Sequence, residues 1–180
     1  LVHTKYGDVL PSNKALAGAG IELIGMERRE FLLRDALDKV KDRYDFLFID
    51  CPPSLELLTL NALCAADAIL VPVQGEYYAL EGLSDLMNTV RIVRRSLNPR
   101  LELDGVLLTM FDGRTNLALQ VAEEVKHYFP GKVYATVIPR NVRLSEAPSH
   151  GKPITSYDRS CRGAEAYVQL AQEFLKRNNG

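Results

Sequence analysis

Residues 46–54 of the chain read Phe-Leu-Phe-Ile-Asp-Cys-Pro-Pro-Ser. Four apolar residues in a row, 46–49, are followed at once by Asp50. Such a run, apolar on both sides of the backbone, is typical of a strand buried on both faces of a parallel sheet. Pro52 and Pro53 have a fixed φ and no N–H, so they end the strand and stiffen the loop that leaves it. The stretch therefore predicts a buried strand that carries a carboxylate at its carboxyl end.

Strand and helix patterns alternate along the rest of the chain. Apolar runs at residues 68–71, 106–108 and 133–138 predict further buried strands, and a short edge strand is expected near Val9. Apolar residues also recur at three- and four-residue steps, as on one face of a helix. These helical stripes cover residues 31–40, 80–97, 117–128 and 167–174. The alternation predicts an α/β fold with a doubly wound, mostly parallel sheet, and we expect a single domain over residues 1–180.

The composition is that of an ordinary globular protein, with 47% hydrophobic and 25% charged residues. No apolar run approaches the roughly 20 residues that span a bilayer, so we expect no membrane partner and a cytoplasmic location. The three cysteines are odd in number and widely spaced, which fits neither a disulfide framework nor a zinc site.

Charge is unevenly distributed along the chain. The net charge is only −1, so no global field attracts nucleic acid. Residues 138–162, however, hold five basic residues against two acidic ones. This basic segment is either a solvated surface or a local site for an anionic partner.

Asp50 is the first candidate for a chemical role. In open α/β sheets, ligands bind beyond the carboxyl ends of the strands. A carboxylate at that position holds Mg²⁺ in P-loop nucleotidases, usually through water, as the Walker B aspartate. The alternative is an ordinary strand-end residue that accepts hydrogen bonds from its own turn.

A nucleotide site of this type also needs the phosphate-binding motif G-x-x-x-x-G-K-[ST]. The only Gly-Lys pairs are Gly131-Lys132 and Gly151-Lys152, and neither has a glycine five residues earlier. The sequence thus contains one half of a nucleotide site.

Three loops that follow predicted strands hold the remaining candidates. Gly75 opens a strand-to-helix turn that either faces a ligand or simply connects two elements. The loop Ile138-Pro139-Arg140-Asn141-Val142-Arg143 offers backbone and amide groups for a purine edge, or is a plain surface loop. Arg114 and Arg143 each come just after a core strand, where they contact phosphates or remain solvated charges.

Several motifs together resemble the ParA/Soj partitioning ATPases, and in order they cover nearly the whole chain. They are Phe48 to Ser54, Asn61-Ala62-Leu63, Pro72-Val73-Gln74, Tyr78-Ala79-Leu80-Glu81-Gly82, Leu107-Leu108-Thr109-Met110 and the long stretch from Ile138 to Pro153. The resemblance implies the deviant-Walker P-loop fold, binding of ATP with Mg²⁺, and a homodimer that encloses the nucleotide. It also implies nonspecific DNA binding on the nucleoid and a ParB-type partner that stimulates hydrolysis.

The resemblance also assigns residues. Asp50 matches the Walker B aspartate, Pro139 and Asn141 match the loop that touches the adenine, and Arg114 and Arg143 match arginines implicated in DNA binding.

The family's Walker A loop and switch I aspartate have no counterpart in these 180 residues. We therefore expect this chain to be the C-terminal part of such an ATPase, without its P-loop strand, and not to hydrolyse ATP by itself. Two alternatives stay open: another deviant-Walker ATPase, of the division-site or iron–sulfur scaffold type, and a non-enzymatic α/β interaction module.

Overall fold

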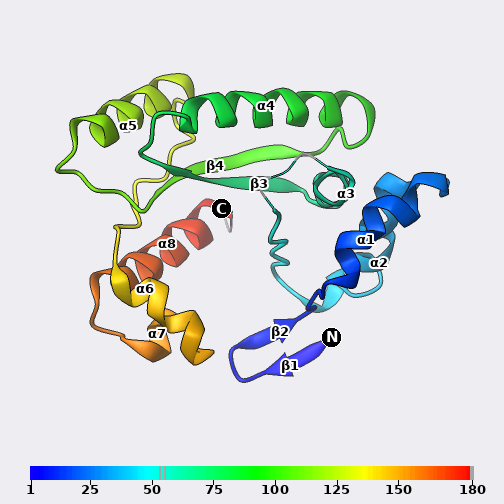
Figure 1. Ribbon diagram of the computed structural model, residues 1–180, viewed down its shortest axis with the longest axis horizontal. Coiled ribbons are helices and arrows are strands. Elements are labelled where there is room, and N and C mark those ends of the chain that lie inside the picture. The colour runs from blue at the N-terminus through cyan, green and yellow to red at the C-terminus, as the bar shows by residue number, and fades with distance from the viewer. Residues whose placement is uncertain (53, 55, 179–180) are drawn as a thin grey trace. The chain divides into compact units, whose positions relative to one another are not determined.

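A computed structural model describes residues 1–52, 54 and 56–178 of the chain (Figure 1). The chain divides into two compact units. Unit 1 comprises Leu1–Ile69 and Asp85–Glu102, and unit 2 comprises Leu70–Ser84 and Leu103–Gly180. The single domain expected over residues 1–180 stays a prediction.

Unit 1 is mainly helical. A hairpin of β1 (Val2–Thr4) and β2 (Gly7–Val9) pairs antiparallel, with Val2 opposite Val9, which confirms the short strand expected near Val9. The helices are α1 (Ala15–Glu22), α2 (Leu32–Leu37), α3 (Leu57–Ala65) and most of α4 (Ala79–Ser96), with 3₁₀ turns η1 (Leu23–Gly25), η2 (Arg29–Phe31) and η3 (Lys41–Arg43).

The core of unit 1 forms where α3 packs against the C-terminal part of α4, because both helices direct an apolar face inward. Its buried members are Leu63, Cys64, Val90, Val93 and Leu101.

Two buried asparagines connect the elements of unit 1. Asn61 on α3 donates its amide to the Arg29 and Leu57 carbonyl oxygens and accepts from the Leu33 N–H at 3.1 Å. Asn98 donates to the carbonyl oxygens of residues 63 and 66 at 3.0 and 2.8 Å. Buried polar groups of this kind are stable because their hydrogen bonds are satisfied. Asn61, which contributed to the family resemblance, thus has a structural role.

Unit 2 contains the sheet. β3 (Ala68–Gln74) and β4 (Glu102–Thr109) pair in parallel, and an extended segment runs parallel to β4 through bridges at Val106–Val133 and Phe111–Pro139. The helices that follow are α5 (Asn116–Tyr128), α6 (Val142–Glu146), the 3₁₀ turn η4 (Ala147–His150), α7 (Ile154–Tyr157) and α8 (Arg162–Asn178).

Helices α5 and α8 lie on opposite sides of β4 (Figure 1). One buried cluster joins β4, the extended segment and α8 through Leu107, Tyr134, Ile138 and Ala166. The α/β fold with a parallel sheet, predicted from the alternating patterns, is confirmed.

The helical predictions at residues 80–97, 117–128 and 167–174 are confirmed by α4, α5 and α8, and the stripe at 31–40 is helical in α2. The strands predicted at 68–71 and 106–108 are confirmed and extended by β3 and β4.

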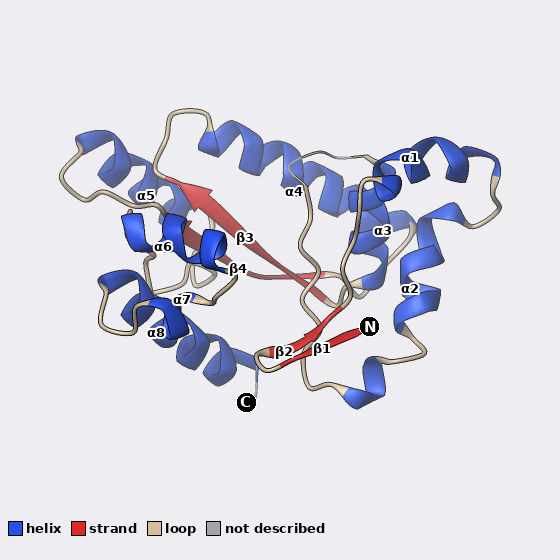
Figure 2. Cartoon of the chain, turned by 60° about the horizontal axis from the view of Figure 1, so that its bottom comes forward, coloured by secondary structure: helices blue, strands red, loops and turns tan. Residues whose placement is uncertain are grey.

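The strand predicted at residues 46–49 is wrong for this structure. In Figure 2 the strand arrows are β1, β2, β3 and β4, and residues 46–49 belong to an irregular stretch between η3 and α3. Leu47 and Phe48 are 41% and 75% exposed. A strand needs neighbours that pair with its N–H and C=O groups, and the described residues provide no ladder for this segment. Pro53, predicted to help end the strand, lies outside the described residues.

The strand predicted at residues 133–138 forms only in part. Its ladder to β4 is interrupted because Glu173 on α8 accepts from the backbone N–H groups of Ala135 and Thr136, each at 2.8 Å. A side chain from another element thus satisfies the backbone where a strand neighbour was expected.

Candidate functional site

The carboxyl ends of the strands in unit 2 bring three loops together. Phe111, after β4, forms the bridge to Pro139, and its carbonyl oxygen accepts from the Arg140 N–H at 3.2 Å. Met110 turns the chain there with φ of 48°, a left-handed conformation that is rare for a residue other than glycine.

The third loop begins at Gly75, after β3. A Cβ at Gly75 would lie 2.8 Å from the Cβ of Ala118 on α5, which is closer than such atoms approach. This glycine thus lets the loop lie against α5, and the ligand-facing role of the loop stays a prediction.

Pro139 and Asn141, the predicted purine contacts, lie in one of these loops. Asn141 begins α6 as its N-cap, and its Oδ1 accepts from the Arg143 N–H at 2.8 Å. Its amide nitrogen has no hydrogen-bond partner in the described part of the chain, which leaves a donor for a ligand acceptor.

Arg114 lies in the loop between β4 and α5. Its Nε and Nη2 donate to the two oxygens of Asp112 at 2.8 and 2.7 Å, while 89% of the arginine side chain is exposed. These hydrogen bonds, together with the Arg114 backbone N–H, lower the pKa of Asp112 to about 2. Thr115 follows as the N-cap of α5 and accepts from the Ala118 N–H.

Arg143 has two carboxylate partners. Its Nη1 lies 2.9 Å from an oxygen of Glu146, and its Nε lies 3.4 Å from an oxygen of Asp158. The Arg143 guanidinium and the Tyr157 hydroxyl both donate to Glu146, and they hold the pKa of that carboxyl below its ordinary value. Both arginines predicted to contact DNA are thus exposed, and both carry internal ion pairs.

Asp50 belongs to unit 1. It is exposed in the irregular stretch before α3, and no ion pair to its carboxylate is found within residues 1–52, 54 and 56–178. An open carboxylate with this freedom fits one water-mediated ligand of Mg²⁺. The same residues contain no group of three or more His, Cys, Asp or Glu side chains that would hold a metal alone.

In the basic segment, residues 138–162, the two acidic residues pair with one arginine and leave the other basic residues without ion pairs among the residues that the structure describes. Its acidic residues, Glu146 and Asp158, both contact Arg143. Its other basic residues form no ion pair with the described chain; they are Arg140, Lys152, Arg159 and Arg162.

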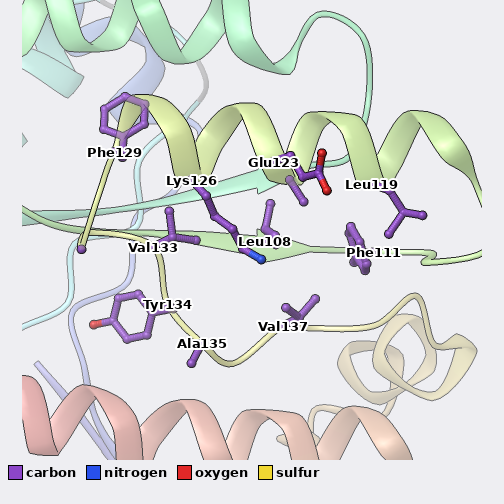
Figure 3. A pocket seen from close by; sticks show the side chains of 12 residues that line it. Leu108, Phe111, Leu119, Glu123, Lys126, Phe129, Val133, Tyr134, Ala135 and Val137 are labelled. Atoms are coloured by element: carbon purple, nitrogen blue, oxygen red, sulfur yellow. The ribbon is translucent and has the colours of Figure 1, made fainter.

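A cavity of about 640 Å³ lies between α5 and the extended segment (Figure 3). Apolar side chains such as Phe111, Val133 and Val137 line most of it, and the Lys126 side chain reaches into it from α5. None of the residues predicted to bind ligand contributes to this cavity.

The sequence reasoning also missed an aromatic pair after β3. Tyr77 and Tyr78 are each 74% exposed, and their rings meet edge to face with centroids 5.2 Å apart. Their position in a loop after a buried strand was the available signal. Separately, none of the described helices is both long and apolar enough to cross a membrane.

Comparison with known proteins identifies the class. A family model described as an AAA domain matches residues 2–103. The structure resembles cobyrinic acid a,c-diamide synthase from Mycobacterium smegmatis, solved with bound ADP and magnesium, with a TM-score of 0.81 and 36% identity over 97% of this chain and 65% of that one. The fold is that of the P-loop ATPases of the ParA/MinD type.

Close relatives in sequence give the family. The sporulation initiation inhibitor protein Soj of Bacillus subtilis is 64% identical over 92% of the chain, and the chromosome partitioning protein ParA of Myxococcus xanthus is 55% identical over 97%. The chain belongs to the ParA/Soj family of partitioning ATPases. It spans 66% and 62% of the lengths of these two relatives.

Proposed function

We propose that the protein is an ATP-dependent DNA-segregation ATPase, which dimerises with ATP, binds DNA without sequence preference and is stimulated by a ParB-type partner. The observation that carries the proposal is the 52–55% identity to relatives named as chromosome-partitioning proteins, over more than nine tenths of the chain. The activity takes place in the cytoplasm, on the nucleoid, because DNA is the surface that the dimer binds.

The residues divide into a nucleotide group and a DNA group. Asp50 holds Mg²⁺ through water, and Pro139 with Asn141 contacts the adenine. Bound Mg²⁺ neutralises charge on the phosphates. The unoccupied amide donor of Asn141 and the open Asp50 carboxylate support this assignment. Arg114 and Arg143 contact DNA phosphates, and the exposure of both side chains supports that role.

The nucleotide role of Asp50 is tested with Asp50→Asn in the whole protein. Binding of a fluorescent ATP analogue is measured with Mg²⁺ and with EDTA. We expect the variant to lose most of the Mg²⁺-dependent gain in affinity, about tenfold, which corresponds to about 1.4 kcal/mol.

Asp45→Asn is the matched control, because Asp45 is another exposed carboxylate of the same irregular stretch. If the affinity for the ATP analogue depends equally on Mg²⁺ in both variants, Asp50 does not hold the metal.

The DNA role is tested by fluorescence anisotropy on random-sequence duplex DNA, with ATP and Mg²⁺, at several salt concentrations. Arg114→Ala and Arg143→Ala are each expected to weaken binding, and Arg114→Ala is expected to reduce the slope of log K against log[salt] by up to about 0.9. Arg94→Ala, an exposed arginine on α4, serves as the control. If neither Arg114→Ala nor Arg143→Ala differs from this control, the assignment of the DNA-binding residues fails.

We also propose that the 180-residue chain does not hydrolyse ATP by itself, because it contains no G-x-x-x-x-G-K-[ST] motif. Phosphate release by the purified chain is compared with release by the whole protein. The proposal that the chain is inactive would be refuted if the purified chain hydrolyses ATP and this activity coelutes with the chain on two different columns.

A further inference from the structure

Arg143 is held from two directions. Glu146 is one turn further along α6 and meets Nη1 at 2.9 Å, whereas Asp158 follows α7 and meets Nε at 3.4 Å. Because the two carboxylates come from different elements, the arrangement is a clamp set by the fold of residues 141–158.

The clamp is braced by an aromatic contact. The Tyr157 hydroxyl donates at 3.1 Å to the same Glu146 oxygen that Arg143 contacts. The His150 ring stacks on the Tyr157 ring, with centroids 4.9 Å apart and an interplanar angle of 26°. The Ser149 hydroxyl also donates to the Glu146 carbonyl oxygen at 2.7 Å. The Tyr157 hydroxyl therefore holds the Glu146 carboxylate beside Arg143, and the Ser149 hydrogen bond fixes the backbone of the same residue.

The local charge determines what a phosphate would encounter. One guanidinium and two carboxylates sum to −1 in the closed clamp, so the clamp itself contributes no attraction for a phosphate, and the attraction at this segment comes from its other basic residues. Arg114 differs, because its single partner Asp112 leaves a neutral pair with an 89% exposed guanidinium. Arg143 becomes an attractive contact only when at least one of its carboxylates is displaced or neutralised.

We propose that Glu146 and Asp158 are positioning residues that compete with DNA phosphate for Arg143 and so set the DNA affinity of the protein. The proposal rests on the proposed function, since it assumes that Arg143 contacts DNA. When phosphate replaces the clamp, the freed carboxylate recruits a cation from solution. This uptake offsets the cation that the DNA releases at the same contact.

The test uses Glu146→Gln in the whole protein, with the anisotropy assay, ATP and Mg²⁺. Glutamine keeps the size and the acceptor for Tyr157 but removes the charge. We expect DNA to bind about three- to tenfold more tightly, and the salt slope to become steeper by up to about one. Glu165→Gln on α8 is the matched control, because it removes an exposed carboxylate that forms no ion pair within the described residues. It reports the effect of net charge alone.

Asp158→Asn tests the other side of the clamp and covers the case in which Glu146→Gln disturbs the fold, which circular dichroism would reveal. The gain is expected to vanish in the double variant Glu146→Gln/Arg143→Ala, because the clamp acts only through Arg143.

Two failures are distinguishable. If Arg143→Ala alone binds DNA as tightly as the unchanged protein does, Arg143 has no role in DNA binding. The proposed competition between the clamp carboxylates and DNA phosphate is then wrong as well. If Arg143→Ala weakens binding but both clamp variants match Glu165→Gln, or bind more weakly, the competition is wrong while the DNA role stands.

Discussion

Gly105 on β4 is the position where a single methyl group should disturb the sheet most directly. It is buried, and a Cβ there would lie 2.7 Å from the Lys132 carbonyl oxygen and 2.7 Å from Cε2 of Tyr134. Real Cβ atoms do not approach other atoms so closely, so Gly105→Ala must move either the extended segment or the Tyr134 ring.

The ring has little freedom to move. Tyr134 is 2% exposed, and its hydroxyl donates to Asp104 at 2.5 Å. Burial first, and this hydrogen bond to a carboxylate second, raise the pKa of Tyr134. The Arg177 guanidinium lies 4.0 Å from the ring centroid. Displacing Tyr134 therefore disrupts several contacts that join β4 to α8.

The expected cost combines two effects. Overpacking of a core typically costs about 1–3 kcal/mol. A hydrogen bond to a charged group contributes about 1.5–3 kcal/mol. We expect the bond from Tyr134 to Asp104 to be weakened rather than lost. We therefore expect Gly105→Ala to lower the free energy of unfolding by about 2–4 kcal/mol, which corresponds to a Tm lowered by about 4–16 °C in a chain of this size.

The assay is urea denaturation followed by far-ultraviolet circular dichroism, because the chain has no tryptophan to report by fluorescence. Gly82→Ala is the control. Gly82 lies exposed in α4 with nothing within 4 Å of an added Cβ, so alanine there should stabilise the helix by about 0.5–1 kcal/mol. A Gly105→Ala protein as stable as the Gly82→Ala protein would refute the packing argument.

Three further outcomes are expected. Asp112 should stay ionised until the pH falls through about 2, and Arg114→Ala should return its pKa toward 3.8, as measured by carbon NMR of the carboxyl group. Burial alone would raise the pKa of Glu173, but hydrogen bonds, chiefly from backbone N–H groups, lower it overall. The ionised Glu173 therefore stabilises the fold above pH 4.5, and this stabilisation is lost as the pH falls through the lower pKa of the folded state. Glu173→Gln should flatten that part of a curve of stability against pH. Asn98→Ala should cost about 1–3 kcal/mol in urea denaturation because two buried carbonyl oxygens lose their donor, whereas Asn88→Ala on α4 should cost less than about 0.5 kcal/mol.

The predicted site residues illustrate how far local patterns reach. The sequence placed Arg114 and Arg143 just after buried strands, and the structure has Arg114 exposed in the loop before α5 and Arg143 exposed in the first turn of α6. Their carboxylate partners were not foreseen. Asp112 is two residues from Arg114 and was within reach of local reasoning, but Asp158 is fifteen residues from Arg143 and meets it only because the chain turns through η4 and α7.

The sequence by itself determined the α/β class, the strands β3 and β4, the long helices and the family, because apolar periodicity and motif order are properties of neighbouring residues. Only the tertiary structure decided whether a given apolar run becomes a strand. Residues 46–49 and 133–138 have equally strong patterns, yet the first forms no ladder among the described residues and the second is interrupted by Glu173. The physical reason is that a strand is stabilised by hydrogen bonds to residues distant in sequence, and no local pattern specifies which groups will be there to make them.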